Sequence, residues 1–137
     1  MILVDTSVWI DHLRYGVPAL SAVLQQEKVL THPFVLGEIA CGNLKKRTET
    51  LIYLKKLPSA PIATDAEVLA FIERGELMGR GVGYMDAHML AATALGGRSR
   101  LWTRDKRLAA VAAEMGFGVD EAELSGGFRV HEPESAY

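Results

Sequence analysis

The chain begins with Ile2-Leu3-Val4-Asp5-Thr6-Ser7-Val8-Trp9, a short apolar run that ends in a carboxylate. The three apolar residues predict a buried strand, and the residues after Asp5 predict a helix that Thr6 or Ser7 can cap. A carboxylate beside a core costs several kcal/mol unless it is paired or binds a metal. This opening therefore predicts a strand whose carboxyl end carries an acid with a specific partner.

Three further acids lie in similar settings. Glu38 interrupts the apolar run 34–40, Asp86 opens an Ala-rich helix, and Asp105 follows Leu101-Trp102-Thr103. Taken singly, Asp5 and Asp105 could be helix caps, and Asp86 could complement a helix dipole. Glu38 has no such explanation, because its helical neighbours are apolar. The four together predict a cluster around a cation.

Short apolar runs alternate with helical patterns along the chain, which indicates an α/β protein. The expected strands are 2–4, 29–31, 61–63, 100–102 and 117–119. A first helix is expected to start near residue 6. Further helices are expected to cover about 18–26, 33–41, 44–56, 64–78, 84–95 and 104–114. We predict a three-layer α/β/α sandwich around a parallel sheet of about five strands, formed by residues 1–125, with a C-terminal tail at 126–137. Sites in such sheets lie beyond the carboxyl ends of the strands.

The composition bounds the class of protein. The 137 residues are 49% hydrophobic and 23% charged, which is typical of one globular domain. No apolar run reaches the roughly 18 residues of a membrane helix, and the start lacks a secretory signal, so we expect a cytoplasmic protein with no membrane partner. Cys41 is the only cysteine, which excludes an internal disulfide, and it is expected in the core.

The net charge of −2 alone does not suggest a nucleic-acid partner. However, basic residues cluster at 45–47, at 55–56 and between 98 and 107, which is compatible with a track for a phosphate backbone. The alternative interpretation of each cluster is an ordinary solvated helix face.

The four acid-bearing segments resemble, in order and spacing, those of PIN-domain nucleases, specifically VapC-type toxins of toxin–antitoxin pairs. They are Ile2 to Asp11, Glu38-Ile39-Ala40-Cys41-Gly42, Asp86 to Ala92, and Leu101-Trp102-Thr103-Arg104-Asp105. The resemblance spans nearly the whole chain. One departure is Leu108, which stands where an aromatic residue is common in that family.

This resemblance implies a PIN-like fold and a divalent-metal-dependent endoribonuclease that acts as a toxin and is inhibited by a cognate antitoxin. It implies Asp5, Glu38, Asp86 and Asp105 as the catalytic acids, with the Thr103 hydroxyl close to metal and phosphate and Thr6 as an accessory residue. A homodimer is expected on the same basis.

An all-oxygen cluster without thiols favours Mg²⁺ or Mn²⁺ over zinc. Asp5, Asp86 and Asp105 are the expected metal ligands, and Glu38 could orient the attacking water or bind the metal through it. His88 lies two positions past Asp86 on a helix and therefore points away from it. His12 and His32 are expected at the surface or near helix ends.

The apolar run 51–54 on the helix 44–56 is wider than one core-facing stripe requires, and Trp9 and Leu13 could extend it. It predicts either a helix buried on two sides or an interface for an antitoxin or a second copy.

Two other functions fit parts of the pattern. A doubly wound phosphatase would require a second aspartate near Asp5, and Thr6-Ser7 stands there instead. A nucleic-acid-binding or protein-interaction module of PIN-like fold without turnover is the main alternative. Binding by basic residues alone weakens with salt and is insensitive to chelators, whereas a metal-dependent nuclease loses turnover in EDTA.

Overall fold

The structure is a computed structural model that describes residues 1–124. Its centre is a parallel sheet of three strands, β1 (Ile2–Val4), β2 (Val29–Leu30) and β3 (Arg100–Trp102), in the order β2-β1-β3. Leu3 of β1 is paired with Leu30 on one side and with Leu101 on the other. The predicted tail at 126–137 lies outside the described residues.

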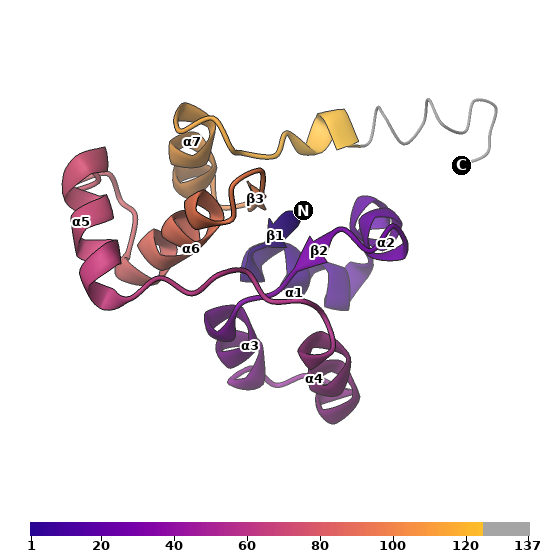
Figure 1. Cartoon of the computed structure of the whole chain (residues 1–137). Coiled ribbons are helices and arrows are strands. Elements are labelled where there is room, and N and C mark those ends of the chain that lie inside the picture. The colour runs from indigo at the N-terminus through magenta and orange to yellow at the C-terminus, as the bar shows by residue number, and fades with distance from the viewer. Residues whose placement is uncertain (125–137) are drawn as a thin grey trace.

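Helices α1 to α7 surround this sheet, as the α/β prediction requires, and residues 121–124 form a further helical turn (Figure 1). The labelled helices are α1 (Thr6–Tyr15), α2 (Pro18–Gln25), α3 (Pro33–Ala40), α4 (Arg47–Lys55), α5 (Asp65–Gly75), α6 (Tyr84–Leu95) and α7 (Lys106–Glu114). In the view of Figure 1, α5, α6 and α7 gather to the left of the sheet, and α1 to α4 lie below it and to its right. No helix among residues 1–124 is long and apolar enough to cross a membrane.

The prediction of about five strands is wrong, because residues 1–124 contain three. Each edge of the sheet carries one isolated bridge instead, Thr31 with Ser59 and Leu101 with Gly118. The first bridge, at Ser59, lies before the predicted strand 61–63. Pro58 and Pro61 flank it, and because a proline has no backbone N–H, neither residue can donate a hydrogen bond that would extend the strand. At the other edge, Leu101 exchanges two backbone hydrogen bonds with residues 117 and 119, so the predicted strand 117–119 pairs at a single position.

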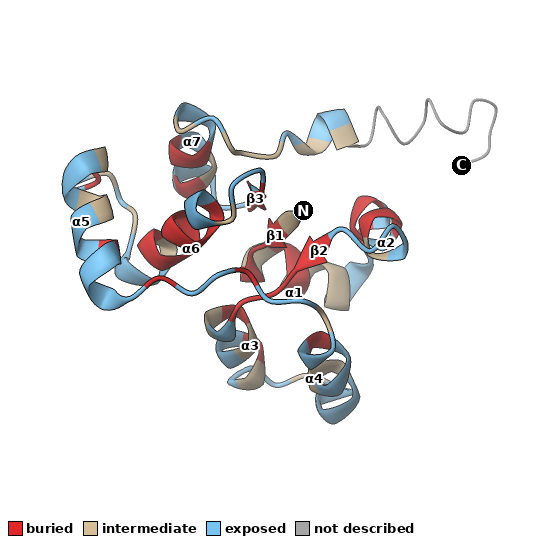
Figure 2. Cartoon of the chain, viewed as in Figure 1, coloured by how far each residue is buried: buried red, intermediate tan, exposed pale blue. Residues whose placement is uncertain are grey.

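The core lies around β1 and α6. Leu3 and Val4 are fully buried, and α6 is buried over consecutive residues from Ala87 to Thr93, which matches its place between the sheet and α5 (Figure 2). Trp9 of α1 is 2% exposed and belongs to this core, so it is not part of an exposed interface. Burial of one large apolar side chain contributes about 1.5–3 kcal/mol. The carboxyl end of β1 is therefore held rigidly.

Several helix starts follow the sequence. The run Thr64-Asp65-Ala66-Glu67 has the pattern of a capping box, and Thr64 and Glu67 form one at the start of α5, while Pro33 occupies the first turn of α3. The predicted cap of α1 by Thr6 or Ser7 is wrong. Asp5 occupies that position, and its side chain makes no capping hydrogen bond.

Candidate active site

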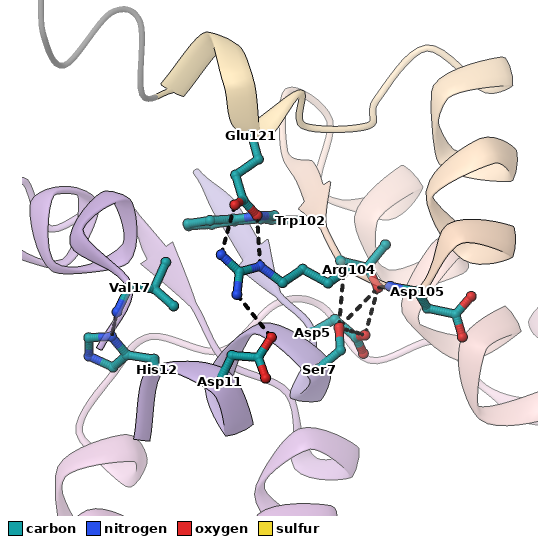
Figure 3. Close-up of polar contacts among 10 residues, drawn as sticks. Asp5, Ser7, Asp11, His12, Val17, Trp102, Arg104, Asp105 and Glu121 are labelled. Atoms are coloured by element: carbon teal, nitrogen blue, oxygen red, sulfur yellow. Dashed lines mark hydrogen bonds and ion pairs between the residues drawn. The ribbon is translucent and has the colours of Figure 1, made fainter. Parts of the chain in front are cut away.

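Asp5 is the acid most firmly placed by the fold. It directly follows the central strand, is 8% exposed, and its backbone N–H donates to the carbonyl of Trp102 on the neighbouring strand (2.9 Å). Instead of capping α1, its carboxylate accepts hydrogen bonds from the hydroxyls of Ser7 (2.8 Å) and Thr103 (2.8 Å), as Figure 3 shows in part. Both bonds fall on Oδ2, which leaves Oδ1 outside this network.

The loop after β3 is attached to the start of α1 by the same hydroxyls. The Ser7 hydroxyl accepts from the backbone N–H of Arg104 (3.0 Å), and the Thr103 hydroxyl accepts from that of Asp105 (3.1 Å). Thr103 therefore lies beside Asp5, one of the predicted catalytic acids, and its proximity to metal and phosphate stays a prediction. Ser7 was considered only as a helix cap, although the run Asp5-Thr6-Ser7 could have indicated a second role for it.

Asp86 and Asp105 have local roles as well. Asp105 caps α7, because its Oδ1 accepts from the backbone N–H groups of Arg107 (3.0 Å) and Leu108 (3.1 Å). Oδ2 of Asp86 accepts from the N–H of Gly83 at the start of α6 (3.2 Å). Both acids therefore stabilise the start of a helix, as expected from their positions in the sequence. These roles do not exclude a function, since each carboxylate has a second oxygen.

Glu38 projects from α3 and is exposed. Its Oε1 accepts a hydrogen bond from the buried hydroxyl of Thr6 (2.9 Å), which connects α3 to the first residue of α1. Thr6 thus contacts one predicted acid, and Ser7 contacts another. The start of α1 connects two of the four acids.

The four acids interact electrostatically. Burial raises the pKa of Asp86 above the ordinary value of an aspartate, and the negative charges of Asp5, Asp105 and Glu38 raise it further, while the hydrogen bond from Gly83 opposes this shift. In the part of the chain that the structure describes, the ion pairs are those of Arg80, His88 and Arg104, so no basic side chain neutralises any of the four. We call this group the acidic edge.

The acidic edge does not form a ready coordination sphere. Within residues 1–124, no three His, Cys, Asp or Glu side chains lie together closely enough to hold one ion. The hydrogen bonds described above direct one oxygen of each carboxylate to its own neighbours. The donor set itself, carboxylate and hydroxyl oxygens, suits a hard cation.

A second charged group lies beside the acidic edge. The guanidinium of Arg104 donates to Glu121 through Nε (2.9 Å) and Nη2 (2.7 Å), and to Asp11 of α1 through Nη1 (2.9 Å). Glu121 also accepts from the indole N–H of Trp102 (2.9 Å). Figure 3 shows the Arg104 side chain pointing away from Asp105, toward these two acids. We call Arg104, Asp11 and Glu121 the arginine clamp.

The clamp shifts the pKa values of its members in opposite directions. The hydrogen bonds from Arg104 hold the pKa of Glu121 below its ordinary value, and those to Glu121 and Asp11 raise the pKa of Arg104. Both shifts favour the charged forms of Arg104 and Glu121. Sequence reasoning missed this group, because its members are far apart along the chain and nothing in the segments that contain Asp11 and Arg104 indicates that the two residues pair.

The remaining candidates are placed away from the acidic edge. His88 is buried with its ring against Phe34 and Tyr84, and its Nε2 lies 3.3 Å from Asp65, which agrees with the prediction that it points away from Asp86. His32 caps α3 by accepting from the N–H of Phe34, but it is fully buried. Cys41, expected in the core, is exposed because it lies at the solvent-facing end of α3.

The apolar helix 44–56 is shorter than predicted, because α4 begins at Arg47. Leu54 is fully buried, whereas Ile52 and Tyr53 are 52% and 48% exposed. The helix is therefore not buried on two sides, and its outer face presents two large apolar side chains.

A small parallel sheet with four acids near the carboxyl ends of its strands defines the class of PIN-domain proteins. Residues 2–114 match the PIN domain family, and the chain belongs to it. In particular, the chain is 47% identical over 121 residues to Ribonuclease VapC32 of Mycobacterium tuberculosis, in both strain CDC 1551 / Oshkosh and strain ATCC 25618 / H37Rv. The alignment covers 88% of this chain and 98% of each relative. The resemblance to VapC-type PIN ribonucleases is thereby confirmed.

Proposed function

We propose that the chain is a divalent-metal-dependent endoribonuclease that hydrolyses RNA phosphodiester bonds and acts as the toxin of a toxin–antitoxin pair. Membership of the PIN-domain family and the identity to two ribonucleases support the reaction class. The assignment of the site rests on the hydrogen bonds of the Asp5 carboxylate, which does not cap α1. It occupies a helix-cap position, yet it is held by Ser7 and Thr103 and has no basic partner among the described residues.

In this proposal Asp5, Asp86 and Asp105 hold Mg²⁺ or Mn²⁺, the cations that prefer carboxylate oxygens. When bound, such a cation acidifies a water molecule and neutralises charge that develops on the phosphate. The charges that raise the pKa of Asp86 also favour a cation at this place, because its arrival relieves their mutual repulsion.

Glu38 would accept a proton from the attacking water, because it is exposed and Thr6 fixes one of its oxygens while the other can face the substrate. Thr103 and Ser7 orient Asp5 and hold the loop that presents Asp105. Among residues 1–124 the acidic edge contains no cysteine or histidine, and no covalent intermediate is needed.

The same family membership supports three further parts of the proposal. The inhibitor is a cognate antitoxin protein, the working unit is a homodimer, and the protein acts in the cytoplasm. The exposed apolar pair Ile52 and Tyr53 on α4 is a candidate contact for the antitoxin or for the second copy.

The test is cleavage of total cellular RNA by the purified protein in Mg²⁺ or Mn²⁺, in EDTA, and by the Asp5→Asn variant. Discrete fragments that require the metal and vanish in the variant are expected. The matched control is Asp65→Asn, which removes an exposed carboxylate away from the acidic edge and should retain cleavage. Cleavage that persists in EDTA, or in Asp5→Asn, would contradict the assignment of this site. RNA binding without cleavage in any metal would favour the binding module instead.

A further inference from the structure

A groove lies beside the acidic edge on the face formed by α1, α3 and the segment 41–46 that joins α3 to α4. Its volume is about 730 Å³. Its walls include the apolar side chains Ile10, Leu13, Ile39 and Leu44, and Glu38 lies in its lining as well. Because Glu38 belongs to the acidic edge, a ligand that fills the groove reaches the proposed site of cleavage.

Three basic side chains line this groove, namely Arg14, Lys45 and Lys46. All are exposed, and none forms an ion pair with another residue in the range 1–124. The backbone that carries the lysines is tied to α3, since Nε of Arg47 donates to the carbonyl of Ala40 (2.9 Å). Three positive charges thus lie next to the acidic edge, and no acidic side chain among the described residues forms an ion pair with them.

The groove also carries an unusually exposed aromatic residue. Tyr15, the last residue of α1, is 79% exposed and lines the groove beside Arg14. An exposed aromatic ring provides a surface on which a nucleobase can stack. A charged groove with an aromatic platform is the combination that binds single-stranded nucleic acid without strict sequence preference.

We propose that this groove binds the single-stranded stretch of the RNA that leads into the acidic edge. Lys45, Lys46 and Arg14 contact its phosphates, and Tyr15 stacks on one base. The proposal rests on the proposed ribonuclease function and adds the path of the substrate. Of the possible occupants, RNA is favoured over an acidic protein segment because Glu38, a member of the acidic edge, lines the groove, and because a continuous phosphate backbone must extend from the cleaved bond onto a neighbouring surface.

The chain offers a matched control for the lysines. Lys55 and Lys56 form a second exposed pair, at the other end of α4, and neither lines the groove. The double variants Lys45→Ala/Lys46→Ala and Lys55→Ala/Lys56→Ala remove the same charge from the protein. Any difference between them reports the position of the charge and not its amount.

The experiment measures binding of a fluorescein-labelled, unstructured RNA 12-mer by anisotropy in Mg²⁺, with Asp5→Asn as the background so that no cleavage occurs. We expect the Lys45/Lys46 variant to bind at least about tenfold more weakly and to lower the salt slope by about 1.4, the value for two phosphate contacts on a single strand. The Lys55/Lys56 variant should change little. Tyr15→Ala should weaken binding, and Tyr15→Phe, which keeps the ring, should restore it. Circular dichroism melts establish that each variant is folded.

Equal losses in the two lysine variants, or no binding of the RNA by the background protein, would overturn the proposal. It would also be overturned if the Lys45/Lys46 variant kept its RNA affinity and lost affinity for the antitoxin, since the groove would then serve a protein partner. Because binding is measured without turnover, these results are separate from failure of the ribonuclease function, which is absence of cleavage by the unmodified protein in every metal.

Discussion

The acidic edge and the arginine clamp lie side by side and use carboxylates in opposite ways. In the clamp, Asp11 and Glu121 surround one guanidinium at 2.7–2.9 Å. At the acidic edge, no basic side chain among residues 1–124 pairs with any of the four acids. The two regions meet in one loop, where Thr103 and Asp105 face the edge and the Arg104 side chain faces the clamp.

The difference shows how an acidic site can be kept free of the protein's own cations. Arg104 lies between two residues of the site, and without its two partners its charge could neutralise the acids beside it. Asp11 and Glu121 hold the guanidinium on the other side of the loop, so the loop stays anchored while the edge keeps its negative charge. The clamp anchors the loop, and the edge retains the negative charge that the proposed cation would require.

The largest expected effect comes from removing charge at the edge. Asp86→Asn keeps an oxygen for the N–H of Gly83 but loses the carboxylate, so metal-dependent cleavage should fall at least about 100-fold. In EDTA the same variant should be more stable than the unmodified protein, by about 0.5–1 kcal/mol, because repulsion among the acids is relieved. Cleavage rates and urea denaturation in EDTA measure the two effects. A variant that loses both activity and stability would show that Asp86 is primarily a helix cap.

A smaller loss of activity should follow from releasing Asp5. Thr103→Val preserves shape and removes the hydroxyl that donates to Asp5 and accepts from Asp105, so the catalytic rate should fall about 10- to 100-fold, as for the partner of a metal ligand. Thr103→Ser retains the hydroxyl and should restore most of the rate. Single-turnover cleavage at saturating metal measures the catalytic rate of each variant. If the valine variant keeps the rate and the serine variant loses it, the methyl group of Thr103 matters and its hydrogen bonds do not.

In the clamp the expected loss is of stability. Glu121→Ala leaves the indole N–H of buried Trp102 without this acceptor and should lower the free energy of unfolding by about 1–3 kcal/mol. Glu121→Gln keeps an acceptor and loses only the charge, so its cost should be about 1 kcal/mol or less for a partly exposed pair. Urea denaturation at neutral pH measures the free energy of unfolding of the two variants. Equal costs would mean that the indole hydrogen bond contributes nothing.

The smallest effect is the pH dependence of the clamp. The pKa of Glu121 is lowered in the folded protein, so its contribution is fully present above the ordinary glutamate value, about 4.3, and is lost as the pH falls through the lowered value. The stability difference between the unmodified protein and Glu121→Gln should therefore shrink as the solution is acidified through that window. A difference that stays constant with pH would show that the effect is one of packing and not of charge.

Local signals in the sequence predicted the parts of the fold that depend on local structure. The strand 2–4, the helix 84–95 and the capping box at Thr64 and Glu67 all follow from patterns within a few residues, and the structure contains them. The number of strands was overestimated, because an apolar run such as 61–63 does not reveal whether its backbone can continue a ladder beside two prolines. The exposure of Cys41 likewise depends on which neighbours cover the end of α3.

The four acids could be predicted together because each stands out from its apolar surroundings or at a helix start, and their expected convergence agrees with the charges that act on Asp86. The clamp could not be predicted. Arg104 and Asp11 are far apart in sequence, and in the sequence alone Glu121 resembles any solvated acid until the fold brings an arginine to it.

The order of strands in the sheet also determines when the site can form. β1 is made first but is flanked by β3, whose residues come about a hundred positions later, and the contact between Asp5 and Thr103 spans the same interval. Pairing across such a separation is slow and must wait for the distant segment. During synthesis, which delivers the N-terminal part first, the emerging chain carries Asp5 without its partner until most of the protein has been translated. The topology therefore delays assembly of the site until β3 and Thr103 have been synthesised.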